Sequence, residues 1–236
     1  MSSVKFHPKG LHVLTSSGDC TVKIWDFTNT ACTHTFKDHT QSVWDIDVHD
    51  TGDFFASAGM DHLGKVFDIN AGKCRHSLRG HVDSVNSIRF QPYSNIIATA
   101  SADKTVSLWD MKSSLCIQTF YGHNNSVNGC AFNLAGDKIV SGDSDGIVKV
   151  WDVRMVKEKE SIDFSEYAAN SVGFDGSGTH IGAALENGES KIYNLEMSKF
   201  ETTMKGHDDA AQDILFDPKA KTIYTCSSDS TFRIWQ

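Results

Sequence analysis

An all-β fold made of repeated four-stranded sheets is predicted by three features of this 236-residue sequence. An aromatic residue recurs every 42 positions, the segments between these residues alternate apolar and polar side chains, and turn residues separate the segments. The recurring aromatic residues are Trp25, Phe67, Trp109, Trp151, Tyr193 and Trp235. Six residues at one unbroken interval indicate a repeat architecture.

The strands of one unit can be placed in order along the chain. The segments SVNSIRF (84–90), NIIATAS (95–101) and TVSLWD (105–110) are typical of three short strands, and LCIQTFYGH (115–123) contains a fourth. A single four-stranded sheet has two open faces and cannot bury both alone, so sheets of successive units should stack on one another. The sequence therefore predicts a β-propeller in which each unit supplies one blade.

Polar residues recur at the same interval as the aromatic residues. Six positions before each aromatic residue stand Asp19, Asp61, Asp103, Asp145, Asn187 and Asp229. Four positions before those residues stand Thr15, Ser57, Thr99, Ser141, Ala183 and Thr225. Histidines stand 22 positions before four of the acidic residues, at His39, His81, His123 and His207. Each complete repeat therefore carries one fixed polar set.

Two dipeptides of the repeat resemble those of the WD-repeat family. Gly-His stands at 80–81, 122–123 and 206–207, and Trp-Asp stands at 25–26, 109–110 and 151–152. In that family the His, Ser/Thr, Asp and Trp form a buried hydrogen-bond network inside each blade. The resemblance implies such networks for His81/Thr99/Asp103/Trp109, His123/Ser141/Asp145/Trp151, His207/Thr225/Asp229/Trp235 and His39/Ser57/Asp61. In the last set Phe67 replaces Trp, so the network should end early.

The repeated His, Ser/Thr and Asp have the residue types of a hydrolytic triad, but a structural role is the better interpretation. A catalytic triad is needed once, whereas this set recurs with fixed spacing. No acidic pair, metal-ligand cluster or phosphate-binding loop stands outside the repeat, so no catalytic, cofactor-binding or metal-binding residue is predicted. An enzyme that uses the central channel of a propeller remains a competing class.

One unit departs from the repeat, and the ends of the sequence fall inside units. Between Arg154 and Lys205, Ser165, Ala183 and Asn187 replace the polar set, although the 42-residue spacing persists. The count predicts five complete blades and a sixth that lacks its outer strand, forming one incomplete domain over 1–236. We interpret this domain as part of a seven-bladed ring whose remaining blade lies upstream.

Composition excludes several classes of function. The net charge of −8 argues against a nucleic-acid surface or docking on anionic lipid. No apolar run approaches the roughly 18–20 residues of a membrane helix. The six cysteines are expected to be free thiols in a reducing compartment, and Cys32/His34 and Cys74/His76 lack a second ligand pair at zinc-site spacing.

Three longer stretches, 43–69, 84–110 and 205–235, resemble the sperm-associated group of axonemal WD-repeat proteins. That resemblance implies a non-enzymatic scaffold of the central apparatus of motile cilia or flagella, located in the cytoplasm as part of the axonemal cytoskeleton. It implies contacts with other central-apparatus proteins and indirect contact with microtubules. Competing interpretations are a dynein-regulator propeller or a substrate receptor of a ubiquitin ligase.

Propellers commonly bind partners through residues that begin each inner strand and through the turn before the Trp strand. The inner-strand positions here are Trp44, Asn86, Asn128, Asn170 and Gln212, and Met60 stands in the turn of the same blade as Trp44. An exposed Trp beside a Met can anchor a partner. The alternative is that Trp44 packs against a neighbouring blade and that the Asn side chains satisfy turn backbones.

Overall fold

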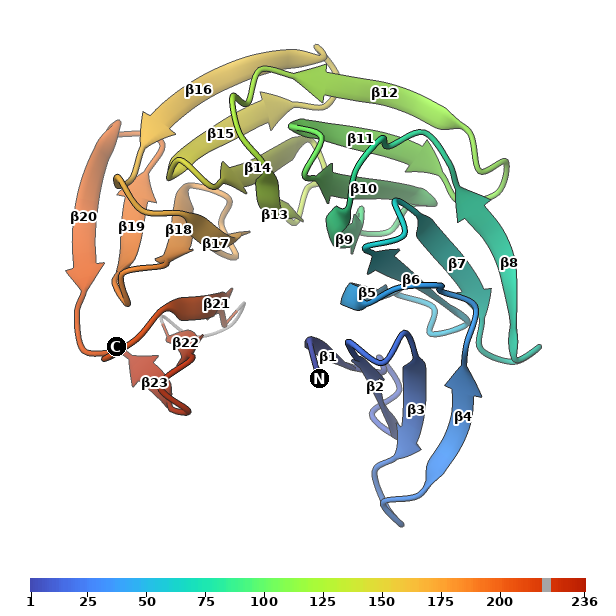
Figure 1. Cartoon of the computed structure of the whole chain (residues 1–236). Helices are drawn as coiled ribbons and strands as arrows, with labels where there is room; N and C mark the ends of the chain where they lie inside the picture. The colour runs from blue at the N-terminus through green and yellow to red at the C-terminus, as the bar shows by residue number, and fades with distance from the viewer. Residues whose placement is uncertain (218–221) are drawn as a thin grey trace. The chain divides into compact units, whose positions relative to one another are not determined.

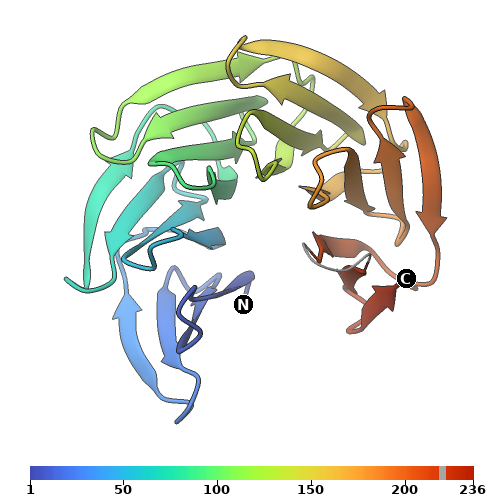
Figure 2. The same cartoon turned by 180° about the vertical axis from the view of Figure 1, so that it is seen from behind.

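A computed structural model describes residues 1–217 and 222–236, which form six antiparallel sheets (Figure 1). Each sheet is one blade, and the chain divides into two compact units, residues 1–119 and 120–236, that are described separately. Every strand lies beside the strand that follows it in its blade, as the same chain seen from behind also shows (Figure 2). The repeat therefore folds as a series of local meanders.

The N-terminal unit (1–119) contains the first two blades and nearly all of the third. The first is β1 (Ser3–Phe6), β2 (His12–Ser16), β3 (Val22–Asp26) and β4 (Cys32–Phe36). The second is β5 (Val43–Val48), β6 (Phe54–Gly59), β7 (Gly64–Asp68) and β8 (Lys73–Leu78). The third is β9 (Val85–Phe90), β10 (Ile96–Ser101), β11 (Thr105–Asp110) and β12 (Cys116–Tyr121), and the boundary between the units falls within β12.

The C-terminal unit (120–236) contains the other three blades. The fourth is β13 (Val127–Phe132), β14 (Lys138–Asp143), β15 (Ile147–Asp152) and β16 (Lys157–Asp163). The fifth is β17 (Ala169–Phe174), β18 (His180–Leu185), β19 (Ser190–Asn194) and β20 (Lys199–Met204). The sixth is β21 (Ala211–Phe216), β22 (Ile223–Ser227) and β23 (Phe232–Trp235).

The blade count among the described residues agrees with the period. Five blades have four strands and the sixth has three. These residues form six blades, and the seventh blade, expected upstream of Met1, stays a prediction. The fifth unit, which lost the polar set, still forms a complete four-stranded blade. Strand formation therefore depends on the apolar alternation and not on the polar set.

Apolar side chains hold successive blades together within each unit. In the N-terminal unit, Leu14, Val22, Ile24 and Phe36 of the first blade pack against Val43, Ile46, Phe55 and Phe67 of the second. In the C-terminal unit, Ile192 and Met204 of the fifth blade pack with Ala211 and Ile214 of the sixth. Burying one large apolar side chain stabilises a fold by roughly 1.5–3 kcal/mol, so these face-to-face contacts dominate blade stacking.

The turn between the second and third strands fixes the backbone at one residue. This residue has a positive φ in every blade, at Cys20, His62, Lys104, Gly146, Gly188 and Ser230. In the fourth blade only glycine fits, because a Cβ on Gly146 would lie 2.1 Å from the carbonyl oxygen of Ser165. In the second, third and sixth blades this tight turn places the Asp that precedes the residue beside the histidine.

Candidate functional site

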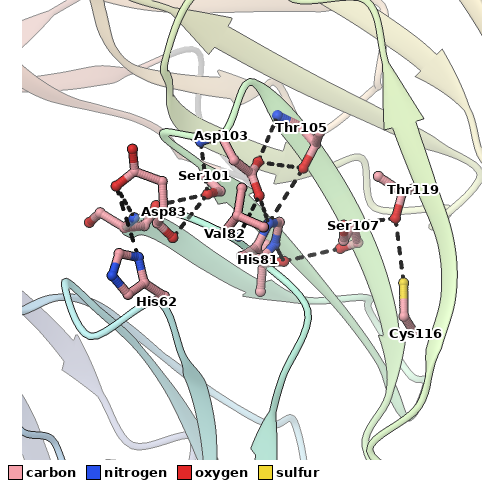
Figure 3. Close-up of polar contacts among 12 residues, drawn as sticks. His62, His81, Val82, Asp83, Ser101, Asp103, Thr105, Ser107, Cys116 and Thr119 are labelled. Atoms are coloured by element: carbon pink, nitrogen blue, oxygen red, sulfur yellow. Dashed lines mark hydrogen bonds and ion pairs between the residues drawn. The ribbon is translucent and has the colours of Figure 1, made fainter.

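The third blade contains the complete predicted network, and Figure 3 shows the part of it formed by His81, Asp103 and Thr105. His81, in the segment before β9, contacts Asp103 of the β10–β11 turn through Nδ1 at 2.7 Å. Its Nε2 lies 2.7 Å from the Thr99 hydroxyl on β10. The indole N–H of Trp109 on β11 donates to the same hydroxyl at 2.8 Å. The Thr105 hydroxyl also donates to Asp103, at 2.6 Å. One histidine thus joins the segment before the blade to two of its strands.

The direction of each hydrogen bond follows from the groups that can donate. The Asp103 carboxylate can only accept, so His81 Nδ1–H donates to it. In the neutral imidazole Nε2 then accepts from the Thr99 hydroxyl, which itself accepts the indole N–H of Trp109. Burial alone raises the pKa of Asp103, but hydrogen bonds from His81 and Thr105 outweigh it and hold this pKa well below its usual range. Thr99 has no solvent exposure, so its hydroxyl cannot reach a substrate and the network has a structural role.

The sixth blade carries the same four-residue network as the third, and the second blade carries it with Phe in place of Trp. His39 contacts Asp61 at 2.9 Å and Ser57 at 2.6 Å, while Phe67 stacks on Phe55 with 4.6 Å between ring centroids. Because Phe67 has no donor, this network ends at Ser57. In the sixth blade the corresponding contacts are His207–Asp229 at 3.0 Å, His207–Thr225 at 2.8 Å and Trp235–Thr225 at 2.9 Å.

In the fourth blade the acid of the network is Asp143, and the assignment of Asp145 was wrong. His123 Nδ1 lies 2.7 Å from Asp143 Oδ2, and its Nε2 lies 2.7 Å from the Ser141 hydroxyl. Trp151 donates to Ser141 at 2.8 Å, as predicted. Asp145 is exposed and accepts a hydrogen bond from Asn125 instead.

The geometry of the turn explains this exchange. Asp143 stands at the end of β14, two residues after Ser141, where the third blade has Ser101. Its Oδ1 accepts the N–H groups of Asp145 and Ile147, both at 3.0 Å. In the third blade, Ser101 and the network aspartate divide these two bonds between them. One carboxylate therefore replaces two side chains and still reaches the histidine.

Replacing Asp143 by asparagine should destabilise the protein far more than replacing Asp145 by asparagine. Asp143 is 1% exposed and accepts charge-assisted bonds, so its loss should cost roughly 1.5–3 kcal/mol. The exposed Asp145 should change the free energy of unfolding by less than about 0.5 kcal/mol. Urea unfolding of both variants measures the difference, and equal losses would show that Asp143 is not the network acid.

The first and fifth blades hold less of the network. In the first blade Trp25 donates to Thr15 at 2.9 Å. In the fifth blade Ala183 is buried without a hydroxyl, and the Tyr193 hydroxyl donates to Glu160 at 2.7 Å. Phe164 and Phe200 pack around the Tyr193 ring, with centroids within 6.2 Å. Aromatic packing around Tyr193 takes the place of the histidine–hydroxyl–indole contacts in this blade, which the sequence pattern did not specify.

A buried carboxylate that the repeat did not reveal joins three blades of the N-terminal unit. Asp45 on β5 accepts hydrogen bonds from Ser3 of the first blade at 3.0 Å and from Ser87 of the third blade at 2.9 Å. The Arg89 guanidinium and the Ile88 N–H of the third blade bind the same carboxylate. Its partners lie about 42 positions away on both sides, so only the stacked structure brings them together.

The predicted partner-facing residues share one structural feature. At the start of five inner strands, β5, β9, β13, β17 and β21, a β-bulge skips one residue. That residue is Trp44, Asn86, Asn128, Asn170 or Gln212. A bulge re-aims a side chain out of the strand alternation. Asn128 and Asn170 use their amides to bind a carbonyl of the next blade, at 3.2 and 2.9 Å. These two amides therefore link adjacent blades by hydrogen bonds.

Trp44 is the bulge residue with the largest exposed apolar surface. It is 41% exposed, and its indole N–H donates to the Ser84 hydroxyl of the third blade at 3.1 Å. Met60 is 45% exposed, and its backbone N–H donates to Ser42, two residues before Trp44. The hydrogen bond fixes the indole across the junction of two blades while leaving much of its ring in solvent.

Comparison with known families identifies the class of protein. The profile of the family described as WD domain, G-beta repeat matches residues 1–26, 30–68, 72–110, 114–152 and 198–236. These segments make up more than half of the chain, so the protein belongs to the WD-repeat family, a scaffold-type fold for protein–protein interaction. The unmatched stretch covers most of the fifth blade, where the polar network is lost.

Individual relatives match over short segments only. Pre-mRNA-processing factor 19 of Mus musculus is 36% identical over 61 residues, which cover 26% of this chain and 12% of the relative. The Oryza sativa subsp. japonica protein of the same name is 42% identical over 65 residues, with the same coverage. Nuclear distribution protein nudF 2 of Penicillium rubens is 39% identical over 51 residues, or 22% and 11% of the two chains.

Residues 1–217 and 222–236 contain no group of three or more His, Cys, Asp or Glu side chains placed to hold a metal ion. No helix in these ranges is long and apolar enough to span a bilayer.

Proposed function

We propose that this protein is a non-enzymatic scaffold of the central apparatus of motile cilia or flagella, and that it acts by binding other central-apparatus proteins. The observation that carries the binding role is the fixed, half-exposed indole of Trp44 beside Met60 on a WD-repeat scaffold. A rigid aromatic side chain loses little conformational entropy on binding and is a frequent hot spot. The axonemal assignment rests on the sequence resemblance of 43–69, 84–110 and 205–235.

The charge of the chain bears on the kind of partner. The exposed turn residues Asp145, Glu166, Glu186, Asp208 and Asp209 add to a net charge of −8. Such a surface favours a partner with clustered Lys or Arg and disfavours nucleic acid or anionic lipid. The outer surface of tubulin is also acidic, so contact with microtubules should be indirect, through neighbouring proteins.

Localisation tests the cellular part of the proposal. The tagged full-length protein should lie along the central pair of a motile axoneme, and its loss should impair motility. Exclusion from motile axonemes would contradict the assignment. Salt-insensitive, saturable binding of the purified chain to bare microtubules would contradict indirect attachment.

Replacing Trp44 by alanine should weaken partner binding by at least about fivefold, because truncating an interface anchor typically costs more than about 1 kcal/mol. Retention of the tagged variant in axonemes after graded salt extraction measures this loss. Tyr93→Ala, which removes an 84% exposed aromatic ring from the β9–β10 turn, is the matched control. Normal retention of Trp44→Ala with an unchanged melting temperature would remove Trp44 from the interface.

A further inference from the structure

The hairpin that joins β15 to β16 in the fourth blade carries exposed cations and exposed apolar side chains together (Figure 1). Arg154, Lys157 and Lys159 are exposed. Met155 and Val156, which stand between them, are 73% and 45% exposed. We call these five residues the fourth-blade tip. The tip is a positively charged, partly apolar surface on a chain whose net charge is −8.

The acids beside the fourth-blade tip are bound by other groups. Asp152 Oδ1 accepts the backbone N–H groups of two tip residues, at 2.9 and 2.8 Å. Glu158 Oε2 accepts a hydrogen bond from the ammonium group of Lys149 at 2.8 Å, and Glu160 accepts one from the Tyr193 hydroxyl at 2.7 Å. Among residues 1–217 and 222–236, none of the three tip cations forms an ion pair. Their charges are therefore available to a partner.

The two lysines present their charges along an outer strand. A hydrogen bond from Asn133, helped by Arg154 at longer range, holds the pKa of Asp137 below its usual value, so Arg154 is partly engaged within the chain. Lys157 and Lys159 stand at alternate, exposed positions of β16, and a β-bulge leaves Lys159 outside the ladder. Within the described residues, β16 lies beside β15 only. Alternate side chains of an extended segment point to one side, so two such acids of a partner can reach both lysines.

The apolar part of the tip is more than the turn needs. Val156 has a φ of 51°, a left-handed conformation that β-branched residues seldom adopt. Serine stands at the equivalent turn position of the third and fifth blades, where Ser114 and Ser198 have φ of 58° and 49°. The Ser114 hydroxyl donates to the carbonyl of Ser113 at 2.6 Å, a bond that valine cannot form. Serine therefore suits this turn, and valine adds exposed apolar surface.

We propose that the fourth-blade tip binds an extended acidic segment of a partner protein, with an apolar side chain of that segment against Met155 and Val156. Charge complementarity decides the chemistry of the partner, because the tip cations lack ion pairs while the nearby acids are occupied. A short acidic segment meets the tip alone, whereas a long nucleic acid or an anionic bilayer would also meet the acidic remainder of the chain. This contact uses none of the residues around Trp44 and does not depend on the axonemal assignment.

Charge reversal at the two lysines tests the proposal in the full chain. The probe is a short fluorescent peptide that alternates glutamate with serine and carries one leucine, and the same peptide with glutamine for glutamate is its control. The double variant Lys157→Glu/Lys159→Glu should bind the acidic peptide at least about tenfold more weakly than wild type in fluorescence anisotropy. Lys199→Glu is the matched control, because Lys199 is the exposed residue at the Lys157 position of the fifth blade, and it should bind like wild type.

A second pair of variants tests the apolar part of the contact. Met155→Ser should weaken binding about threefold, whereas Met197→Ser, which changes the 62% exposed counterpart of Met155 in the fifth blade, should leave it unchanged. Circular dichroism verifies that each variant folds. The proposal is overturned if the wild-type chain does not bind the acidic peptide, if it binds the glutamine peptide equally well, or if the double lysine variant binds like wild type. Binding of phosphatidylserine vesicles through the tip, without binding of the peptide, would also overturn it.

Discussion

Replacing Trp109 by alanine is expected to lower the free energy of unfolding by roughly 3–5 kcal/mol. The indole is 1% exposed, and a Cβ on Gly80 would lie only 3.0 Å from it, so the ring fills its site closely. Its removal leaves a cavity and also takes the donor from Thr99. A typical domain is stable by about 5–15 kcal/mol, so this single change should shift the urea midpoint strongly.

Trp109→Phe separates packing from hydrogen bonding. It keeps an aromatic ring but removes the N–H, which should cost about 0.5–1.5 kcal/mol for the bond alone plus a smaller packing loss. The second blade already tolerates this change, since Phe67 is fully buried at the equivalent position. Wild-type unfolding of Trp109→Ala would show that the residue does not support the core.

The fold was predictable because its signal is periodic. The 42-residue interval places strands such as β9 to β12 within a few residues of their observed bounds, since alternation and turn residues are local properties. The histidine, hydroxyl and Trp contacts also follow the interval, because each blade repeats the same local geometry. Where equivalent residues of successive repeats make equivalent contacts, the 42-residue interval is enough to predict those contacts.

The assignment of Asp145 failed because spacing cannot choose between two acids in one turn. Asp143 and Asp145 both lie near His123 in sequence, but the side chain of Asp143 projects from the end of β14 toward the ring. Spacing also cannot show what an exposed polar residue does. Asn128 and Asn170 occupy predicted partner positions, yet their amides join adjacent blades. These outcomes depend on side-chain direction and on contacts between repeats.

Asp45 was missed for a related reason, since its role has no counterpart in the next two repeats. Ser87 stands one repeat after it and Gly129 two repeats after it, and an acid recurs at this position only at Asp213, so the interval does not mark the position as a shared acidic site. The contact pattern is a relation between three blades. A residue that joins repeats is conspicuous only in the stacked structure.

Replacing Asp45 by alanine is expected to cost roughly 2–5 kcal/mol at neutral pH, because it leaves the Arg89 cation without its buried partner. It also removes the acceptor for Ser3 and Ser87 on the neighbouring blades. Urea unfolding at pH 7 measures the loss. The variant should unfold at a lower urea concentration than Asp47→Asn, its matched control on the same strand.

The pH dependence of the two neighbouring acids should have opposite signs. Burial alone raises the pKa of Asp45, but Arg89, Lys5 and hydrogen bonds from the third blade hold it below its usual value. Its stabilising effect is therefore present above the unfolded pKa and is lost as the pH falls through the folded pKa. Burial raises the pKa of Asp47. The ionised Asp47 therefore lowers the free energy of unfolding at neutral pH, and this loss disappears when the pH falls and Asp47 is protonated.

The Asn variants convert this difference into a measurement. Asp45→Asn should be less stable than wild type at pH 7. The difference in unfolding free energy should narrow as the pH falls from about 4 toward the lower folded pKa of Asp45, because the unfolded wild-type chain then binds a proton that the folded carboxylate does not. Asp47→Asn keeps an acceptor for the Phe90 N–H and should be neutral or stabilising at pH 7. A constant gap between Asp45→Asn and wild type across this range would show that the charge of Asp45 does not hold the three blades together.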